Sequence, residues 1–403
     1  MIDSMYLNIL MNLRENFSVK LITGFRGTGK LNLLDMFAER LKLEGVNEEK
    51  IIFINFEEIE DFSNFQQLYL YINNRIADVD YAYLLFYGIH VVDGWEKAVN
   101  ALFLGASVEI YIVDSNEKLL LEKLLAFLPD NLDVMKMYPM SFTKFMEASS
   151  VDNNRKIFEK TDIAYFLDKY LKLGGLPVIA QHLSDEKTSQ KLLTGLLYEV
   201  LLKDITIKYS LRNSYLFQVI LRFLAFNLGK PMKIKNLEKR FAEINLSVTP
   251  FTLNNYLNII DESGVFRKIS RYDVKNNVFL NGSEYYYCAD SGICNALLNF
   301  KFQNETALIK NVVYLELLRQ GYEVYCAKIG TMSADFFAIS DKGKLCIQIL
   351  PTHEKNSLTK FLRPLHKLPN NIEKLLISKE SVEIKGSVKS ISVVDFLLHR
   401  DYV

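Results

Sequence analysis

The sequence predicts an α/β protein that begins with a parallel β-sheet covered by helices. Two observations predict this: short apolar runs alternate with helical patterns, and a glycine-rich turn joins the first run to the first helix. Hydrophobic residues make up 49% of the chain and charged residues 24%, which is typical of packed domains rather than disorder. At roughly 100–200 residues per domain, 403 residues allow two to four domains.

The alternation of strands and helices covers the first domain, which we place at residues 1–148. We expect strands at residues 19–23, 51–56, 83–87 and 108–113, and helices at residues 31–43, 68–77 and 95–104. Strands that alternate with helices form parallel sheets, because each return crossing lies over a face of the sheet.

Three further domains are expected, at residues 149–214, 215–280 and 281–403. The first is helical and is broken at residues 174–177; it follows a polar, Asn-rich boundary at residues 149–156. The second consists of three helices and a hairpin, and Pro250 stands in the first turn of its third helix. In the last we expect a helix at residues 305–320 and strands at residues 323–327, 334–339 and 344–350.

Composition excludes several classes of protein. Lys plus Arg and Asp plus Glu each number 48, so the chain is not uniformly basic, although a local basic patch remains open. Four cysteines without a C-x-x-C pair predict reduced, buried thiols, and five scattered histidines do not form a zinc motif. The longest apolar run, residues 81–92, is too short to span a bilayer, and no signal peptide is evident. We therefore expect a cytoplasmic protein that does not use a membrane.

The glycine-rich turn matches the phosphate-binding pattern G-x-x-x-x-G-K-[ST] at seven of eight positions. Its residues are Gly24, Phe25, Arg26, Gly27, Thr28, Gly29, Lys30 and Leu31. In such a loop the backbone N–H groups point at phosphate oxygens, and the lysine neutralises the β and γ charges. ATP or ADP is therefore the candidate ligand; the alternative is a turn that only connects a strand to a helix.

The eighth position departs from the pattern. Leu31 stands where Ser or Thr would bind Mg²⁺, and a leucine side chain cannot coordinate a hard cation. Asn32 lies about 100° further round the helix and is a poor substitute. The sequence therefore argues against Mg²⁺ at this loop.

Over nearly its full length the chain resembles a family of prokaryotic AAA-type ATPases. The blocks that carry the resemblance are residues 22–30, 94–98, 114–116, 138–142, 174–177, 203–205, 271–273, 285–290 and 321–324. The resemblance implies a P-loop domain, a helical and winged-helix middle and a C-terminal domain of restriction-endonuclease-like type.

The resemblance also implies that groups needed for hydrolysis are missing. Tyr87 stands where the family has a Mg²⁺-binding Asp, Gly88 where it has a water-activating Glu, and residues 76–154 contain no arginine. An arginine finger alone is worth roughly 10³–10⁵ in rate, so turnover should be negligible. Asp114 replaces a glycine and would repel phosphate, unless it holds a metal ion from its neighbouring strand.

The winged-helix segment is locally basic. Residues 229–275 contain nine basic and five acidic residues, and Arg267, Lys268 and Arg271 lie on the expected wing. These three are the candidate nucleic-acid-binding residues, since a basic wing suits DNA phosphates. The recognition helix at residues 250–261 has no Lys or Arg, so a module that packs between domains is the competing interpretation.

In the C-terminal domain the resemblance places an endonuclease site that has lost its ligands. Asp335 and Gln348 persist, whereas Lys310 stands at the helical carboxylate position and Leu350 at the catalytic lysine. One carboxylate does not assemble a catalytic metal site, so nuclease activity is not expected.

Three functions follow. The leading one is a degenerate AAA-type ATPase that binds nucleotide as a regulatory or binding module. The second is an active ATPase with non-standard metal ligands, and the third is a winged-helix DNA-binding protein with a vestigial loop. The sequence names no protein partner.

Overall fold

The computed structural model describes residues 4–58, 62–149, 160–301, 304–352 and 358–399. Contacts divide the chain into two compact units, residues 1–138 and 139–403. The expected boundary at residues 149–156 lies, beyond Ser149, outside the described residues. The finer division into four domains stays a prediction.

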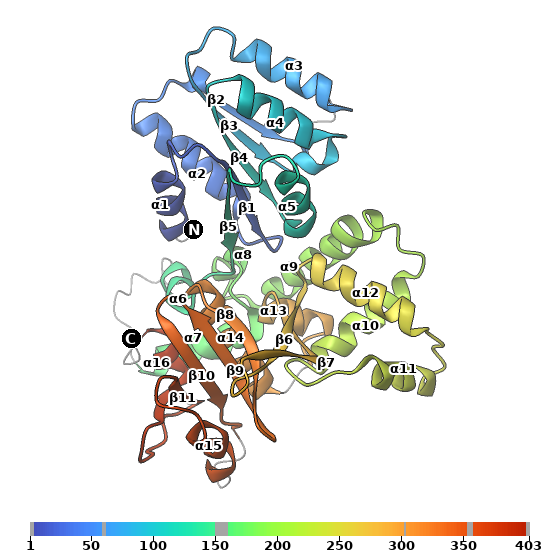
Figure 1. Cartoon of the computed structure of the whole chain (residues 1–403), viewed down its shortest axis with the longest axis vertical. Helices are drawn as coiled ribbons and strands as arrows, with labels where there is room; N and C mark the ends of the chain where they lie inside the picture. Colours follow the sequence, from blue (N-terminus) through green and yellow to red (C-terminus); the bar gives the residue numbers. More distant parts are fainter. Residues whose placement is uncertain (1–3, 59–61, 150–159, 302–303, 353–357, 400–403) are drawn as a thin grey trace. The chain divides into compact units, whose positions relative to one another are not determined.

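The N-terminal unit is built on a parallel sheet of five strands in the order β2-β3-β4-β1-β5 (Figure 1). The strands are β1 (Val19–Gly24), β2 (Ile51–Asn55), β3 (Ala82–Tyr87), β4 (Val108–Asp114) and β5 (Leu132–Met137). The first four lie where the sequence predicts them. We did not predict β5, whose alternating polar residues give it a mixed rather than an apolar character.

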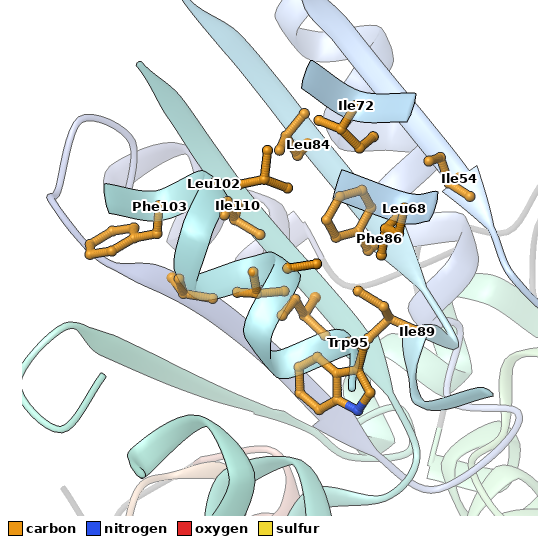
Figure 2. Packing of buried hydrophobic residues seen from close by; sticks show 14 of the residues in the cluster. Ile54, Leu68, Ile72, Leu84, Phe86, Ile89, Trp95, Leu102, Phe103 and Ile110 are labelled. Carbon is orange, nitrogen blue, oxygen red and sulfur yellow. The ribbon is translucent and has the colours of Figure 1, made fainter. Parts of the chain in front are cut away.

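Helices cover both faces of this sheet, as the alternating pattern predicts. They are α1 (Ser4–Asn12), α2 (Lys30–Leu43), α3 (Phe65–Arg75), α4 (Trp95–Gly105) and α5 (Glu117–Leu125), with short 3₁₀ turns η1 (Glu48–Lys50) and η2 (Ile89–Val91). One core joins α3, α4 and α5 to the sheet, and Trp95 is fully buried in it (Figure 2). The other core joins α1 and α2 to the opposite face.

Neighbouring strand residues enter opposite cores, because side chains alternate across a strand. Leu21 of β1 packs in the first core and Ile22 in the second; Leu84 and Leu85 of β3 divide in the same way. Covered on both faces, the strands are continuously apolar, which is why their positions could be predicted.

The C-terminal unit contains the remaining helices. They are α6 (Phe142–Ser149), α7 (Lys160–Leu173), α8 (Pro177–Ala180), α9 (Glu186–Glu199), the π-helical segment η4 (Val200–Ile207), α10 (Ser214–Phe226), α11 (Ile234–Glu243), α12 (Pro250–Glu262), α13 (Ser291–Leu297), α14 (Glu305–Arg319), α15 (Leu358–His366) and α16 (Val393–Leu397). The expected break at residues 174–177 separates α7 from α8. The expected start of α12 is also present, where the Thr249 side chain accepts a hydrogen bond from the Thr252 N–H.

A seven-stranded mixed sheet completes this unit in the order β12-β11-β10-β9-β8-β6-β7. Its strands are β6 (Phe266–Asp273), β7 (Val278–Cys288), β8 (Glu323–Ile329), β9 (Met332–Ser340), β10 (Gly343–Ile349), β11 (Glu373–Ser378) and β12 (Lys389–Ser392). The hairpin expected as a wing is β6 and β7. From Arg271 to Asp273, β6 also pairs with β8, so the hairpin continues the sheet.

A buried carboxylate joins two segments that are distant in the sequence. Asp290 is 1% exposed and accepts hydrogen bonds from the backbone N–H groups of Gly175, Gly292 and Ile293 at 2.8, 2.8 and 3.2 Å. A Cβ on Gly174, where φ is +80°, would lie 1.9 Å from the carboxylate. Burial raises the pKa of Asp290 to about 6. The glycine pair of residues 174–175 therefore makes room for Asp290.

Two general features bear on function. All four cysteines are buried and unpaired, and burial raises the pKa of Cys326 and Cys346, so these two are poor thiolate nucleophiles. In the part of the chain that the structure describes, no helix has the length and apolar character to cross a bilayer.

Candidate functional site

The residues 24–31 of the glycine-rich loop lie between β1 and α2, at the carboxyl edge of the parallel sheet. Gly24, Gly27 and Gly29 have φ values of +152°, +85° and +93°, in the region that favours glycine. A Cβ on Gly24 would also lie 2.3 Å from the backbone oxygen of Met137 on β5. The glycines at these positions are thus required by the path of the backbone.

This backbone path leaves hydrogen-bond donors available. The N–H groups of Gly27 and Gly29 donate to no acceptor among the described residues, whereas the Thr28 N–H donates to the Phe25 carbonyl at 3.3 Å. The first helical residue after them is Lys30. Unpaired N–H groups at the start of a helix make an environment that favours an anion.

The Lys30 ammonium is held inside the loop. Lys30 is 4% exposed, and its Nζ donates to the carbonyls of Gly24 and Phe25 at 2.7 and 3.0 Å. Thr28 is also buried, and its hydroxyl donates to the Phe25 carbonyl at 2.9 Å. The predicted residues 24–31 therefore come together as one loop that carries a buried positive charge, whereas Leu31 offers no polar atom to a cation.

The neighbouring strand end places a carboxylate beside the loop. Asp114, the last residue of β4, is in register with Thr23 of β1. Its Oδ2 lies 2.5 Å from His90 Nδ1, and its Oδ1 accepts a hydrogen bond from the Asn116 N–H at 3.0 Å. Both carboxylate oxygens of Asp114 therefore have partners. The His90 imidazole lies beside the carboxylate that we expected to repel phosphate. In the described residues, no three His, Cys, Asp or Glu side chains gather as a metal site would require.

Two polar atoms near this edge lack partners. The Thr23 hydroxyl and the Asn116 side-chain nitrogen are buried without a hydrogen bond to any described residue. Leaving such a group unsatisfied costs about 1–3 kcal/mol, which a water or a ligand atom would recover. The residues present thus fit a polar, anionic ligand at the carboxyl edge of β1 and β4.

Sequence reasoning missed one charged residue at this site. Glu57, just beyond β2, forms a two-pronged ion pair with Arg26 of the loop, with N–O distances of 3.0 and 3.3 Å. A Cβ on Gly88, at the end of β3, would lie 3.1 Å from Glu57 Cγ. A carboxylate from β2 therefore stands beside the position where the family resemblance expects one from β3. No pattern in the sequence marks Glu57, because the pairing of β2 beside β3 brings it to the loop.

In the C-terminal unit, the side chains around Asp335 pair with one another. Lys310 Nζ lies 2.5 Å from Asp335 Oδ1. Asp335 Oδ2 accepts hydrogen bonds from Gln348 Nε2 at 2.6 Å and from the Ile349 N–H at 2.8 Å. The lysine ammonium occupies the side of Asp335 that a metal ion would need.

The three predicted nucleic-acid-binding residues lie on β6. Arg267 and Lys268 are adjacent on this strand, so their side chains point to opposite faces of it. Lys268 Nζ lies 3.4 Å from Glu284 of β7, and Arg271 is in register with Cys326 of β8. The strand therefore does not present the three as one basic surface, and DNA binding stays a prediction.

Comparisons with known proteins find two matching domain families and two relatives of similar length. Residues 16–146 match the model of a family described as an AAA domain, and residues 165–304 match a domain of unknown function (DUF8612). An uncharacterized protein of Haemophilus influenzae is 30% identical over 98% of this chain and 97% of its own length. An uncharacterized protein of Methanocaldococcus jannaschii, MJ1544, is 22% identical over 87% of this chain and 79% of its own.

One solved structure is similar enough in shape to support the fold. It is the Walker-type ATPase PABY2304 of Pyrococcus abyssi, with a TM-score of 0.53 and 14% identity over 74% of this chain and 96% of the other. At that identity the similarity concerns the fold alone. Together with the parallel sheet and the loop at its edge, it shows that the N-terminal unit has a P-loop NTPase fold of the AAA type.

Proposed function

We propose that this chain, which belongs to the same family as the Haemophilus influenzae protein and carries an AAA domain, is a nucleotide-binding module. ATP or ADP binds at residues 24–31, hydrolysis is impaired, and the bound state regulates a partner that the chain contacts. The single observation that carries the proposal is the loop: unpaired Gly27 and Gly29 N–H groups lie beside the buried Lys30 ammonium.

Hydrolysis needs groups that this site does not supply from the usual positions. Leu31 has no hydroxyl for Mg²⁺, Tyr87 has a phenol in place of a carboxylate, and Gly88 has no side chain. Phosphate binding, in contrast, depends on backbone N–H groups and on Lys30, all of which remain. This difference supports binding with little turnover.

Thermal unfolding with and without nucleotide tests the proposal. A ligand that binds only the folded state at 100 times its Kd stabilises it by about 2.7 kcal/mol, so ATP and ADP should raise the Tm. The shift should be similar with Mg²⁺ or with EDTA. It should disappear in Lys30→Ala and persist in Lys42→Ala, a matched change at the opposite end of α2, where Lys42 makes only surface ion pairs. No shift at millimolar nucleotide would show that the loop is vestigial.

A second candidate, a working ATPase, is favoured by Glu57. Its carboxylate lies beside Gly88, where an attacking water would need a base, and Arg26 holds it there. Steady phosphate release that is lost in both Lys30→Ala and Glu57→Gln, and kept in Glu58→Gln, would support this function. Phosphate release at the level of buffer in the unaltered chain would exclude it.

A further inference from the structure

A cavity with a polar lining lies in the C-terminal unit, at the amino edge of three parallel strands. Its volume is about 630 Å³, and its wall is formed by the first residues of β10, β11 and β12 and by the segment before β11. Pockets of about 300–1,000 Å³ hold small-molecule ligands. The cavity is unrelated to Asp335, which pairs with residues at the opposite, carboxyl end of β10.

The wall of this cavity is strongly basic. Four lysines line it, namely Lys342, Lys344, Lys374 and Lys389, against one carboxylate, Glu373. Glu373 pairs with Lys389 at 2.9 Å. Lys342 and Lys344 form no ion pair with any described carboxylate. The cavity therefore has an uncompensated positive charge, which an anionic ligand would neutralise.

Lys374 strengthens this argument because it is buried. The residue is 4% exposed, and its Nζ donates to the Leu368 carbonyl at 2.9 Å; no described carboxylate pairs with it. An ammonium has three donors, and a buried charge is costly unless it is paired. With one neutral acceptor among the described residues for its three donors, the Lys374 ammonium has donors left for an anionic group.

We propose that this cavity binds a phosphorylated small molecule of about the size of a mononucleotide, with its phosphate between Lys344 and Lys374. Lysine ammonium groups bind phosphate as point charges. Tyr322, Asn370 and Asn371 line the same cavity, and an aromatic ring and amides suit the uncharged part of such a molecule. The site is separate from the loop at residues 24–31 and does not depend on the function proposed there.

AMP binding to the full chain tests the site. The measurement is made on the Lys30→Ala variant, so that the loop does not contribute, by equilibrium dialysis of labelled AMP, with adenosine as the uncharged control. We expect one equivalent of AMP to bind, with an affinity that falls as salt increases, and adenosine to bind at least about tenfold more weakly, since the phosphate supplies the attraction. Absence of AMP binding overturns the proposal.

Two sets of variants locate the bound AMP. Lys342→Glu/Lys344→Glu changes two exposed residues and should weaken binding by at least about tenfold through charge repulsion. Lys275→Glu/Lys301→Glu makes the same change in charge at exposed positions elsewhere in the unit and should leave binding within about twofold. Equal losses in the two variants would overturn the proposal. Lys374→Met should abolish binding if it folds; the exposed pair decides the matter if it does not.

The phosphorylated end of a nucleic acid has the same phosphate group as a small molecule. A competition experiment distinguishes the two ligands. A 5′-phosphorylated oligonucleotide and its unphosphorylated twin are added as competitors of labelled AMP. Competition by free AMP, with neither oligonucleotide competing better, supports a small-molecule site. Binding of the oligonucleotides in the absence of any AMP binding overturns it in favour of a nucleic-acid surface.

Discussion

The loop at residues 24–31 and the cluster around Asp335 differ in where their polar groups come from. The loop keeps unpaired N–H groups and a buried lysine. At Asp335 the polar groups are side chains, and the Lys310 ammonium pairs with the carboxylate. The donors of the loop belong to the backbone, so a side-chain substitution leaves them in place. The polar groups at Asp335 belong to side chains, so a substitution there changes them directly.

The largest expected effect follows from breaking the backbone path itself. Gly24→Ala should lower the free energy of unfolding by about 3–4 kcal/mol, since it adds both left-handed strain and a clash with the Met137 carbonyl. Urea unfolding measures the loss, and the Tm shift with ATP should vanish. Gly45→Ala is the control: its φ is +90°, but a Cβ there meets nothing within 4 Å, so only strain of about 1 kcal/mol remains. Equal losses of stability in Gly24→Ala and Gly45→Ala would contradict the close approach of Gly24 to the Met137 carbonyl.

Asp290 extends the comparison to a carboxylate whose partners are all backbone amides. Its pKa is about 6 in the folded chain against 3.8 for an ordinary aspartate. The raised pKa means that the folded state favours the protonated form. Its stabilising contribution is complete below pH 3.8 and is lost as the pH rises through about 6, which amounts to about 2–3 kcal/mol.

Denaturant unfolding between pH 4 and 7 measures this dependence. Asp290→Asn should remove it, because an amide does not titrate. The variant should also be less stable at low pH by about 1–2 kcal/mol, since its amide N–H group would face the Gly175 N–H. An unchanged pH dependence in Asp290→Asn would show that another group is responsible.

Substitutions of Lys310 test the cluster around Asp335. Lys310→Glu should cost about 1–2 kcal/mol in metal-free buffer, because two carboxylates then face each other. Millimolar Mg²⁺ or Mn²⁺ should restore part of this stability by bridging them. Lys310→Gln should lose stability that metal does not restore. A response to metal that is equally large in the unaltered chain would contradict the closed site.

The smallest effect is expected at β6. Arg267→Ala/Lys268→Ala/Arg271→Ala should lower retention on a DNA duplex, and each lost phosphate contact should reduce the salt slope by about 0.9. The effect should be modest because Lys268 is paired with Glu284. Lys187→Ala/Lys191→Ala on α9 is the control. Unchanged retention would favour the interpretation of this segment as a packing module.

Several elements could be predicted because their pattern is local. The strands β1 to β4 are apolar runs, and α2 follows a glycine-rich turn, so composition and periodicity locate them. β5 escaped prediction because only some of its residues are buried. We expected the hairpin of β6 and β7 in a different domain from the strands at residues 323–350. Its pairing with β8 could not be predicted, because it joins residues more than 50 positions apart in the sequence.

In the candidate site too, the contiguous part could be predicted and the part formed by distant residues could not. Residues 24–31 could be named from their order because a phosphate loop is contiguous. Glu57 could not, because it approaches Arg26 and Gly88 only when β2 pairs beside β3. The basic cavity could not be predicted either, since its lysines come from three strands and the turn before β10 and form no motif.

The order of amino acids by itself determined the parallel sheet and the glycine-rich loop. It also determined that position 31 has no hydroxyl group for Mg²⁺, because each of these features depends on neighbours in the chain. Only the tertiary structure decided which side chains meet: Arg26 with Glu57, His90 with Asp114, and Lys310 with Asp335. The physical reason is that electrostatic attraction depends on distance in space, and the pairing of strands sets that distance for residues far apart along the chain.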